Sequence, residues 1–333
     1  MSTVEVAASR FASLRERLPA KQLPVLVTLA LFGLMYGVGI LRYEGFYDTQ
    51  IFLNLFIDNG FLLVVAIGMT FVILTGGIDL SVGSVVALST MVSSSLLTEK
   101  GWSPYLVMVL VLAIGSVLGF LMGCMIHYFD IQPFIVTLAG MFLARGLCFI
   151  ISTDSISITD KTWVAIADYK LPLGNYHLSW SAIVSLVVLA VAVWVLSYTK
   201  FGRNVYAIGG SEQSALLMGL PVARTKIAVY TISGFCSALG GIVMTFYTLS
   251  GHGRGAIGLE LDAIAAVVIG GTLLTGGAGY VLGTVVGVCV LGIIQTIINF
   301  EGDLSSSWTR IVIGILLFVF IMLQRVVRLG QRT

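Results

Sequence analysis

Charged residues are scarce in this chain. Lysine and arginine number 18 and aspartate and glutamate 16, which is 10% of the 333 residues, whereas a soluble domain carries roughly a quarter. Hydrophobic residues make up 58% of the chain. This balance excludes a soluble globular domain. The few basic residues form no patch, so we expect no nucleic-acid partner.

Histidine and cysteine are also rare, at three and four residues. The cysteines lie singly in apolar runs without CxxC spacing, so we expect small core residues and no metal site or disulfide. A phosphate loop needs Gly-Lys followed by Ser or Thr, but the single Lys-Ser/Thr pair, Lys161-Thr162, follows Asp160. With no nucleophile elbow or paired carboxylates either, we expect no enzyme, no catalytic residue and no cofactor in this chain.

Long hydrophobic runs take up most of the length. A transmembrane helix needs about 20 apolar residues, and the sequence predicts an all-α integral membrane protein of about ten such helices, with broken helices at the membrane centre. One transmembrane domain is expected over 23–325, with segments 1–22 and 326–333 outside it. The predicted spans are 23–41, 58–75, 80–97, 104–126, 133–151, 179–198, 226–249, 260–275, 280–298 and 308–324.

The basic residues predict the topology. With the N-terminus inside, the inner segments hold eleven basic residues and the outer segments five, and cytoplasmic loops are the ones enriched in Lys and Arg. Both termini are therefore expected in the cytoplasm. The longest outer loop, 152–178, is polar and could be a plain solvated loop or a short lid or docking surface.

Residues 71–84, FVILTGGIDLSVGS, interrupt the hydrophobic pattern. Two glycines favour a break in the helix. Asp79 then stands where an N-cap would stand, able to accept from the amides of Ser81 or Val82 and to start a helix at Leu80. Broken membrane helices are tolerated where they are buried or line a polar cavity, so a translocation pathway is the functional alternative to a simple cap. The candidate pathway residues here are Thr75, Gly76, Gly77, Asp79, Ser81, Gly83 and Ser84, whose hydroxyls and carboxylate suit a neutral polyhydroxylated solute.

An internal echo repeats this motif 200 residues later. LTGGIDLSVGSVV (74–86) and LTGGAGYVLGTVV (274–286) share seven of thirteen positions, which predicts two related halves. Thr275, Gly276 and Gly277 join the candidate pathway residues. Gly279 stands where the first copy has Asp79, so the halves do not contribute equivalent carboxylates. Arg145 is a second charge within a predicted span, able to pair with a carboxylate or to line the same route.

A short helix is predicted in the inner segment at about 200–226. Ser211 is a good N-cap, and Gly219 with Pro221 is a strong stop, which leaves a helix over 212–218. It could be an ordinary interfacial helix or the element that seats the membrane subunit in a groove of a motor protein. The candidate coupling residues are Gly210, Ser211, Glu212, Leu216, Met218 and Gly219.

Four ordered motifs carry a resemblance to a known family. These are FVILTGGIDLSVGSVVAL (71–88), IQPFIVTLAGMFLARG (131–146), VYAIGGSEQSALLMGL (205–220) and ELDAIAAVVIGGTLLTGGAGYVLGT (260–284). The chain resembles the permeases of ribose-type bacterial sugar ABC importers. Its segment INFEGDLSSSWTRIVIGILLFVFIMLQR (298–325) is most similar to one of the paired permeases of the galactofuranose importer.

This resemblance implies an inner-membrane subunit that moves a monosaccharide by alternating access. It implies a second permease, ABC ATPase subunits that bind ATP and Mg, and a periplasmic sugar-binding protein as partners, beside membrane lipid. Residue chemistry alone leaves a different class open, an ion-coupled secondary sugar carrier that uses Asp79, and a membrane scaffold as a third.

Overall fold

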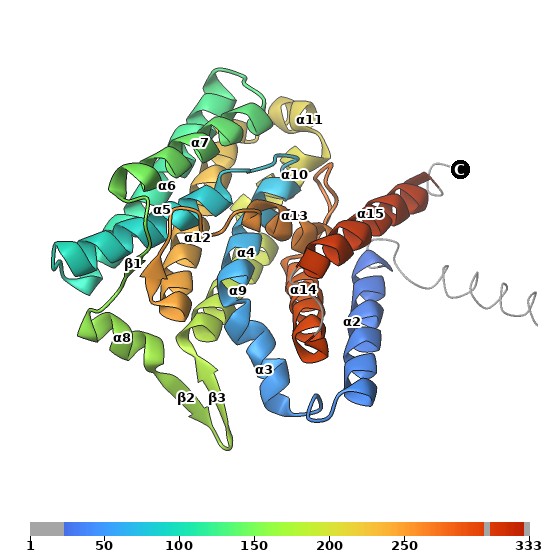
Figure 1. Ribbon diagram of the computed structural model, residues 1–333. Helices are drawn as coiled ribbons and strands as arrows, with labels where there is room; N and C mark the ends of the chain where they lie inside the picture. Colours follow the sequence, from blue (N-terminus) through green and yellow to red (C-terminus); the bar gives the residue numbers. More distant parts are fainter. Residues whose placement is uncertain (1–22, 303–306, 330–333) are drawn as a thin grey trace, which may run out of the picture.

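Long apolar runs fold as helices because a helix satisfies its own backbone hydrogen bonds where water is absent. The computed structural model of the protein describes residues 23–302 and 307–329, so the predicted segment 1–22 lies outside the described residues. The helices are α2 (Leu23–Arg42), α3 (Thr49–Asp58), α4 (Gly60–Leu74), α5 (Val82–Ser94) continued by the π-helical turn η1 (Ser95–Glu99), α6 (Pro104–Tyr128), α7 (Pro133–Ile151), α8 (Lys161–Asp168), α9 (Trp180–Tyr198), α10 (Lys200–Gly210), α11 (Glu212–Leu217), α12 (Val222–Thr248), α13 (Leu259–Ile269), α14 (Val281–Glu301) and α15 (Ser307–Leu329). The short strands are β1 (Ile156–Ser157), β2 (Lys170–Leu173), β3 (Tyr176–Ser179) and β4 (Ser250–Gly251) (Figure 1).

The helices confirm the predicted membrane-spanning architecture. Among the described residues, seven helices are long and apolar enough to cross a membrane, and the pair α3–α4, bent by 58°, adds an eighth if it forms one span. The predicted span 260–275 is wrong. Helix α13 has only 11 residues, about 16 Å of helix, against a hydrocarbon core about 30 Å thick. At the other end α15 continues to Leu329, so the predicted tail 326–333 begins as helix.

Helix α12 lies at the centre of the bundle, in contact with α4, α5 and α6 (Figure 1). Its packing against α6 depends on glycine. A Cβ added to Gly234 would lie 2.1 Å from the carbonyl oxygen of Gly115, and one added to Gly119 would lie 2.2 Å from that of Tyr230. Small residues of this kind let two membrane helices bring their backbones together. The close packing turns the polar residues of α12 toward α4 and α5.

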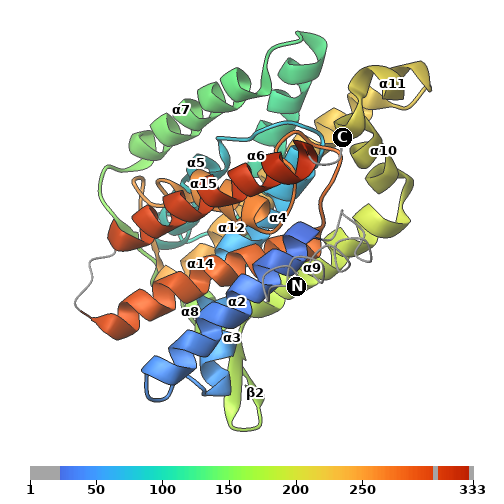
Figure 2. The ribbon, with the colours of Figure 1, turned by 90° about the vertical axis from the view of Figure 1, so that its right-hand side faces the viewer.

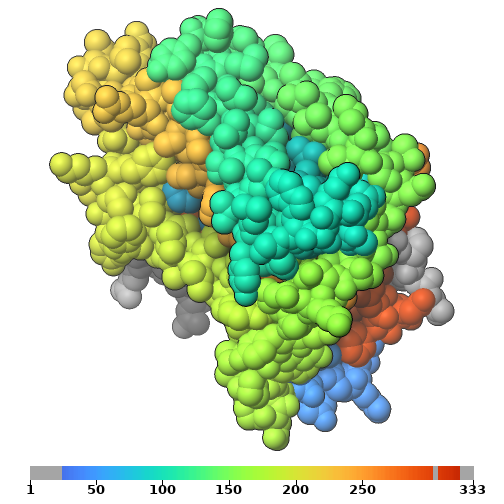
Figure 3. All heavy atoms as spheres, turned by 90° about the vertical axis from the view of Figure 1, so that its left-hand side faces the viewer, coloured from blue at the N-terminus to red at the C-terminus, as the bar shows by residue number. Residues whose placement is uncertain are grey.

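The two ends of the bundle carry different structures. Figures 1 and 3 show α8 and the hairpin β2–β3 projecting at one end and α10–α11 at the other, and the hairpin and α11 also lie at opposite ends in Figure 2. At the hairpin end, β1 pairs antiparallel with β4, with Ile156 opposite Gly251. Trp163 of α8 is buried and packs on Phe246 of α12, with ring centroids 5.0 Å apart. The predicted outer loop 152–178 is therefore a folded cap held against the bundle.

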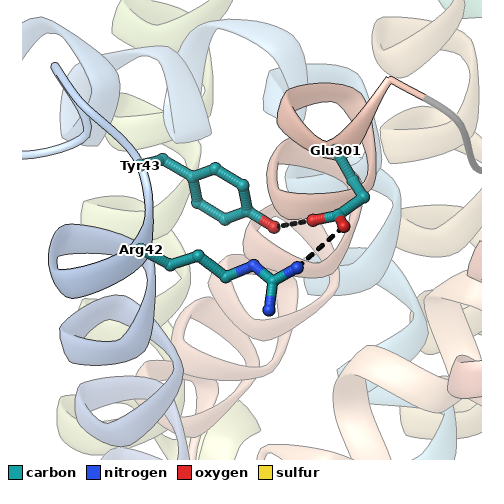
Figure 4. Close-up of polar contacts among 3 residues, drawn as sticks. All are labelled: Arg42, Tyr43 and Glu301. Atoms are coloured by element: carbon teal, nitrogen blue, oxygen red, sulfur yellow. Dashed lines mark hydrogen bonds and ion pairs between the residues drawn. The ribbon is translucent and has the colours of Figure 1, made fainter.

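The ends of α2 and α14 meet through Glu301 (Figure 4). Its carboxylate forms an ion pair with Arg42, 2.8 Å from oxygen to nitrogen, and also accepts a hydrogen bond from the hydroxyl of Tyr43. Exposed pairs of this kind contribute about 0–1 kcal/mol. Their consequence is geometric, because they place the end of α2, predicted to be outside, beside the end of α14.

Exposed apolar side chains cover the outward side of α6, whose surface fills the centre of Figure 3. Val109 is 65% exposed, Val117 54% and Leu121 51%. A helix that shows such residues to its surroundings has lipid as its natural solvent. This face supports the expected contact with membrane lipid.

Candidate functional site

The two Thr-Gly-Gly segments of the internal echo lie against each other. The amide of Gly277 donates to the carbonyl oxygen of Leu74 at 2.9 Å. Gly76 and Gly276 both have φ +80°, a left-handed conformation that favours glycine. A Cβ added to Gly276 would lie 2.7 Å from the amide nitrogen of Gly76. Segments 200 residues apart therefore form one double loop, which directly follows the end of α4.

The double loop is partly open to its surroundings. Gly76 and Thr275 are exposed, whereas Gly77 and Gly276 are buried. The hydroxyl of Thr75 donates back to the carbonyl oxygen of Val72 at 2.8 Å, which closes the last turn of α4. The predicted break is thus present in both copies, and its exposed side consists of backbone and small residues.

Asp79 follows the first loop and is fully buried. Its Oδ1 accepts from the amide of Ser81 at 2.9 Å and from the hydroxyl of the same residue at 2.6 Å. Its Oδ2 accepts from the hydroxyl of Ser233 on α12 at 2.7 Å. The predicted bond to Ser81 is present, but the predicted helix start at Leu80 is wrong. Helix α5 begins at Val82 because Asp79 first closes a local turn around residue 80.

Sequence reasoning missed two partners of this loop on α12. Ser233 completes the hydrogen bonds of Asp79. Tyr230 reaches Gly77, where an added Cβ would lie 2.3 Å from the phenol oxygen. That hydroxyl is buried and has no hydrogen-bond partner among the described residues. The signal was a polar stripe of Tyr230, Ser233 and Ser237 at helical spacing within a predicted span.

Gly83 and Ser84 lie in the first turn of α5, beyond the double loop. A Cβ added to Gly83 would lie 2.3 Å from Oε2 of Glu260 on α13 and 2.7 Å from the carbonyl oxygen of Ala256. The Ser84 hydroxyl is buried without a hydrogen-bond partner in the described part of the chain. The structure therefore separates these two predicted pathway residues from Gly76 and Gly77.

Helix α10 packs directly on the double loop. A Cβ added to Gly209 would lie 1.8 Å from the carbonyl oxygen of Leu74 and 2.4 Å from the amide nitrogen of Gly277, the two atoms that join the loops. The hydroxyl of Tyr206 donates to the carbonyl oxygen of Gly279 at 2.9 Å. One short helix thus contacts both copies of the motif.

Helix α11 follows α10 and lies where it was predicted. Ser211 occupies the N-cap position, and its side chain accepts from the amide of Ser214 at 3.2 Å. Gly219, with φ +74°, ends the segment. Glu212 forms an ion pair with Lys226 of α12 at 2.6 Å. The apolar side chains of the helix point outward, with exposed fractions of 62% for Leu216, 82% for Leu217 and 67% for Met218.

Arg145 has no carboxylate partner at ion-pair distance among the described residues. Its Nη1 instead donates to the carbonyl oxygens of Gly253 and Gly255, at 2.7 and 2.8 Å. The two ion pairs of the described residues are Arg42–Glu301 and Lys226–Glu212. The sequence left two roles open for Arg145, an ion pair with a carboxylate or a place along the pathway. The geometry does not support the ion pair.

Asp79→Asn should keep the fold, because an asparagine oxygen still accepts from Ser81 and its amide group can donate to the hydroxyl of Ser233. Asp79→Ala leaves buried donors without an acceptor, and we expect it to lower the free energy of unfolding by about 1–3 kcal/mol. Thermal unfolding of the purified chain in detergent measures both variants, with the exposed Asp154→Asn as the control. Equal losses in the asparagine and alanine variants would contradict this account of the turn.

Comparison with known proteins places the chain among membrane permeases. It is 46% identical over 307 residues, 92% of each chain, to the inner membrane ABC transporter permease protein YjfF of Escherichia coli (strain K12). It is 42% identical over 318 residues, 93% of each chain, to the fructose import permease protein FruG of Bifidobacterium longum (strain NCC 2705). The ribose import permease protein RbsC of Bacillus subtilis (strain 168) is 40% identical over 301 residues, 89% of this chain and 91% of that one. No solved structure is detectably similar to the chain.

The model of one family covers most of the described structure. It matches residues 51–321, from α3 through most of α15, and so includes the double loop, α10 and α11. The curated relatives cover more than two thirds of the chain at 30% identity or above. The chain belongs to the family described as the branched-chain amino acid transport system / permease component.

Proposed function

We propose that this chain is the membrane permease of a sugar ABC importer and moves a monosaccharide, galactofuranose, across the bacterial inner membrane by alternating access. The permeases similar to it include fructose and ribose import proteins. The resemblance of residues 298–325 to a galactofuranose permease supports the finer choice of sugar. Both termini lie in the cytoplasm in this proposal, as the distribution of basic residues favours.

The observation that carries the proposal is the contact of α10 with both Thr-Gly-Gly loops. Helix α11 presents exposed apolar side chains at one end of the molecule, where an ABC ATPase subunit can hold it. Helix α10 directly precedes α11 in the chain, and its Gly209 packs against the hydrogen bond between Gly277 and Leu74. A displacement of α11 by the ATPase therefore reaches both halves of the permease at the same point.

The same arrangement supports a choice of pathway residues. We assign the double loop (Thr75, Gly76 and Gly77 with Thr275, Gly276 and Gly277) to the cytoplasmic gate of the pathway. Asp79 and Ser81 hold the shape of the first loop, and Gly83 and Ser84 lie farther along the route. A second permease supplies the other half of the pathway, and a periplasmic sugar-binding protein delivers the solute to the folded cap around α8. ATP and Mg are bound by the ATPase subunits.

Reconstitution of the four kinds of subunit in liposomes tests the function. We expect uptake of labelled sugar only with ATP and the binding protein present, and no ATP hydrolysis by this chain alone. A panel of D-galactose, which includes the furanose form in solution, D-ribose, D-fructose and L-arabinose tests the choice of sugar. Uptake of a pentose or fructose without galactose would contradict the galactofuranose assignment. Uptake by this chain alone under a proton or sodium gradient would instead support the ion-coupled carrier.

Substitutions on α11 test the coupling role. Met218→Asp places a charge on an exposed apolar position, so it should leave folding intact and weaken co-purification with the ATPase by about tenfold, as loss of a hot-spot contact does. Glu212→Gln removes the ion pair with Lys226 and should have a smaller effect of the same sign. Leu173→Asp, also exposed and apolar but on the hairpin at the opposite end, is the matched control. Assembly and ATP-driven uptake equal to the control in both α11 variants would refute the coupling assignment.

Gly209→Ala tests the link between α10 and the double loop. The added methyl overlaps two backbone atoms, so α10 must shift, and overpacking of this kind costs about 1–3 kcal/mol. We expect the complex to assemble, because α11 is unchanged, but sugar uptake per ATP hydrolysed should fall. Gly37→Ala on α2 is the control, since no atom lies within 4 Å of its added Cβ. A coupling ratio equal to that of the control would show that this contact does not transmit the movement.

A further inference from the structure

Four of the few charged side chains of this protein lie on three neighbouring helices. Arg145 is on α7, Glu260 and Asp262 are in the first turn of α13, and Arg310 is near the start of α15. In Figure 1, α13 lies between α7 and α15. Glu260 lies within electrostatic range of Arg145, and Asp262 of Arg310. Arg145 lies in a helix long and apolar enough to cross a membrane, where an ionisable residue is costly and is a candidate functional residue.

The irregular backbone next to Arg145 favours contact of this surface of the protein with water. The segment between β4 and α13 enters at the level of the last two turns of α7, where Nη1 of Arg145 binds the carbonyl oxygens of Gly253 and Gly255. Non-helical backbone at that depth is tolerated where it is buried in protein or lines a water-filled cavity. Arg145 is half-buried and Ile257 is 59% exposed, so the segment is not enclosed within this chain.

Glu260 has unused hydrogen-bonding capacity at this place. Its Oε2 is buried against Gly83 and has no hydrogen-bond partner among the described residues. The ion pairs of the described residues do not include Glu260 or Arg145. Both hydrogen bonds of Arg145 come from one nitrogen, Nη1, which leaves Nε and Nη2 available. Glu260 as a whole is half-buried, so one oxygen of its carboxylate is enclosed without a donor, an arrangement that costs stability.

A guanidinium beside a carboxylate recognises neighbouring hydroxyls on a sugar. The carboxylate accepts from two hydroxyls, and the guanidinium donates to a hydroxyl or ring oxygen. The hydroxyl of Ser84, buried and without a partner among the described residues, follows Gly83 directly. We propose that Arg145 and Glu260 form a solute-binding subsite for a neutral polyhydroxylated sugar, on the outer part of the pathway near the folded cap. The subsite rests on the proposed transport function and adds a place where the sugar is held after its release from the binding protein.

Glu260→Gln in the reconstituted complex tests the subsite. Glu260 is half-buried and only its Oε2 lacks a partner, so the amide of the same shape should change thermal stability little. Sugar uptake should fall by about tenfold, the loss expected for one hydrogen bond to a charged group. Assembly of the complex, measured by co-purification, should not change. Glu99→Gln is the matched control, because Glu99 is an exposed carboxylate at the same end of the molecule and accepts a hydrogen bond from the hydroxyl of Ser95.

A thiol probe gives an independent readout that does not require transport. In a background with the four native cysteines replaced by alanine, Leu261→Cys on α13 should react with a charged methanethiosulfonate reagent much faster than Val109→Cys on the lipid-facing side of α6. Both positions are more than half exposed, at 60% and 65%, so the comparison isolates access to water. Added sugar that is a substrate of the wild-type complex should slow the reaction at position 261.

The outcomes separate the two levels of the proposal. A wild-type complex that takes up no sugar would overturn the proposed function, and the subsite would fall with it. Normal uptake by wild type and by Glu260→Gln would overturn the subsite and leave the function intact. If Glu260→Gln lowers both thermal stability and sugar uptake, Glu260 is a structural residue and the subsite is overturned. Equal thiol reactivity at positions 261 and 109 would show that this side faces lipid and would also overturn the subsite.

Discussion

The hydrogen bond from the amide of Gly277 to the carbonyl oxygen of Leu74 is the contact on which the arrangement of this protein depends. It joins two loops that lie 200 residues apart in the sequence, and it gives a hydrogen-bond partner to the backbone carbonyl of Leu74 at the end of α4. Leu74 is buried, and a buried backbone carbonyl without a partner costs free energy. The approach needed for this bond leaves no room for a Cβ at Gly276 or Gly209, which accounts for glycine on two of the three segments that meet there. On the third, Gly76 has φ +80°, a conformation that favours glycine.

The polar residues of α12 complete the same centre from the other side. Asp79 is a carboxyl group without a cation partner at ion-pair distance in the described residues, and its two oxygens accept from one amide and two hydroxyls. A buried polar group of this kind is stable inside a protein only when its hydrogen bonds are made. The bonds to Ser81 and Ser233 fix where α5 begins relative to α12.

Sequence patterns predicted the local features well. Helix α11 has the expected cap at Ser211 and the expected stop at Gly219, because capping depends on residues within one turn of each other. The break after α4 was predicted for the same local reason. The error at 260–275 has a different cause. Its apolar residues continue through Leu273 and Leu274, so hydropathy predicts a span, but Gly270 and Gly271 end α13 at the point where it meets α14.

By itself, the sequence determined that the chain is a helical membrane protein, where most helices begin and end, that a Thr-Gly-Gly break occurs twice, and which family the motifs resemble. These properties follow from hydropathy, capping and glycine, which act over a few turns of chain. Only the tertiary structure decided that the two breaks form one loop pair under α10, that Ser233 and Tyr230 serve the first of them, and that Arg145 and Glu260 share one side. Those contacts join residues far apart in the chain, and helix packing, which no local pattern encodes, sets the distances between them.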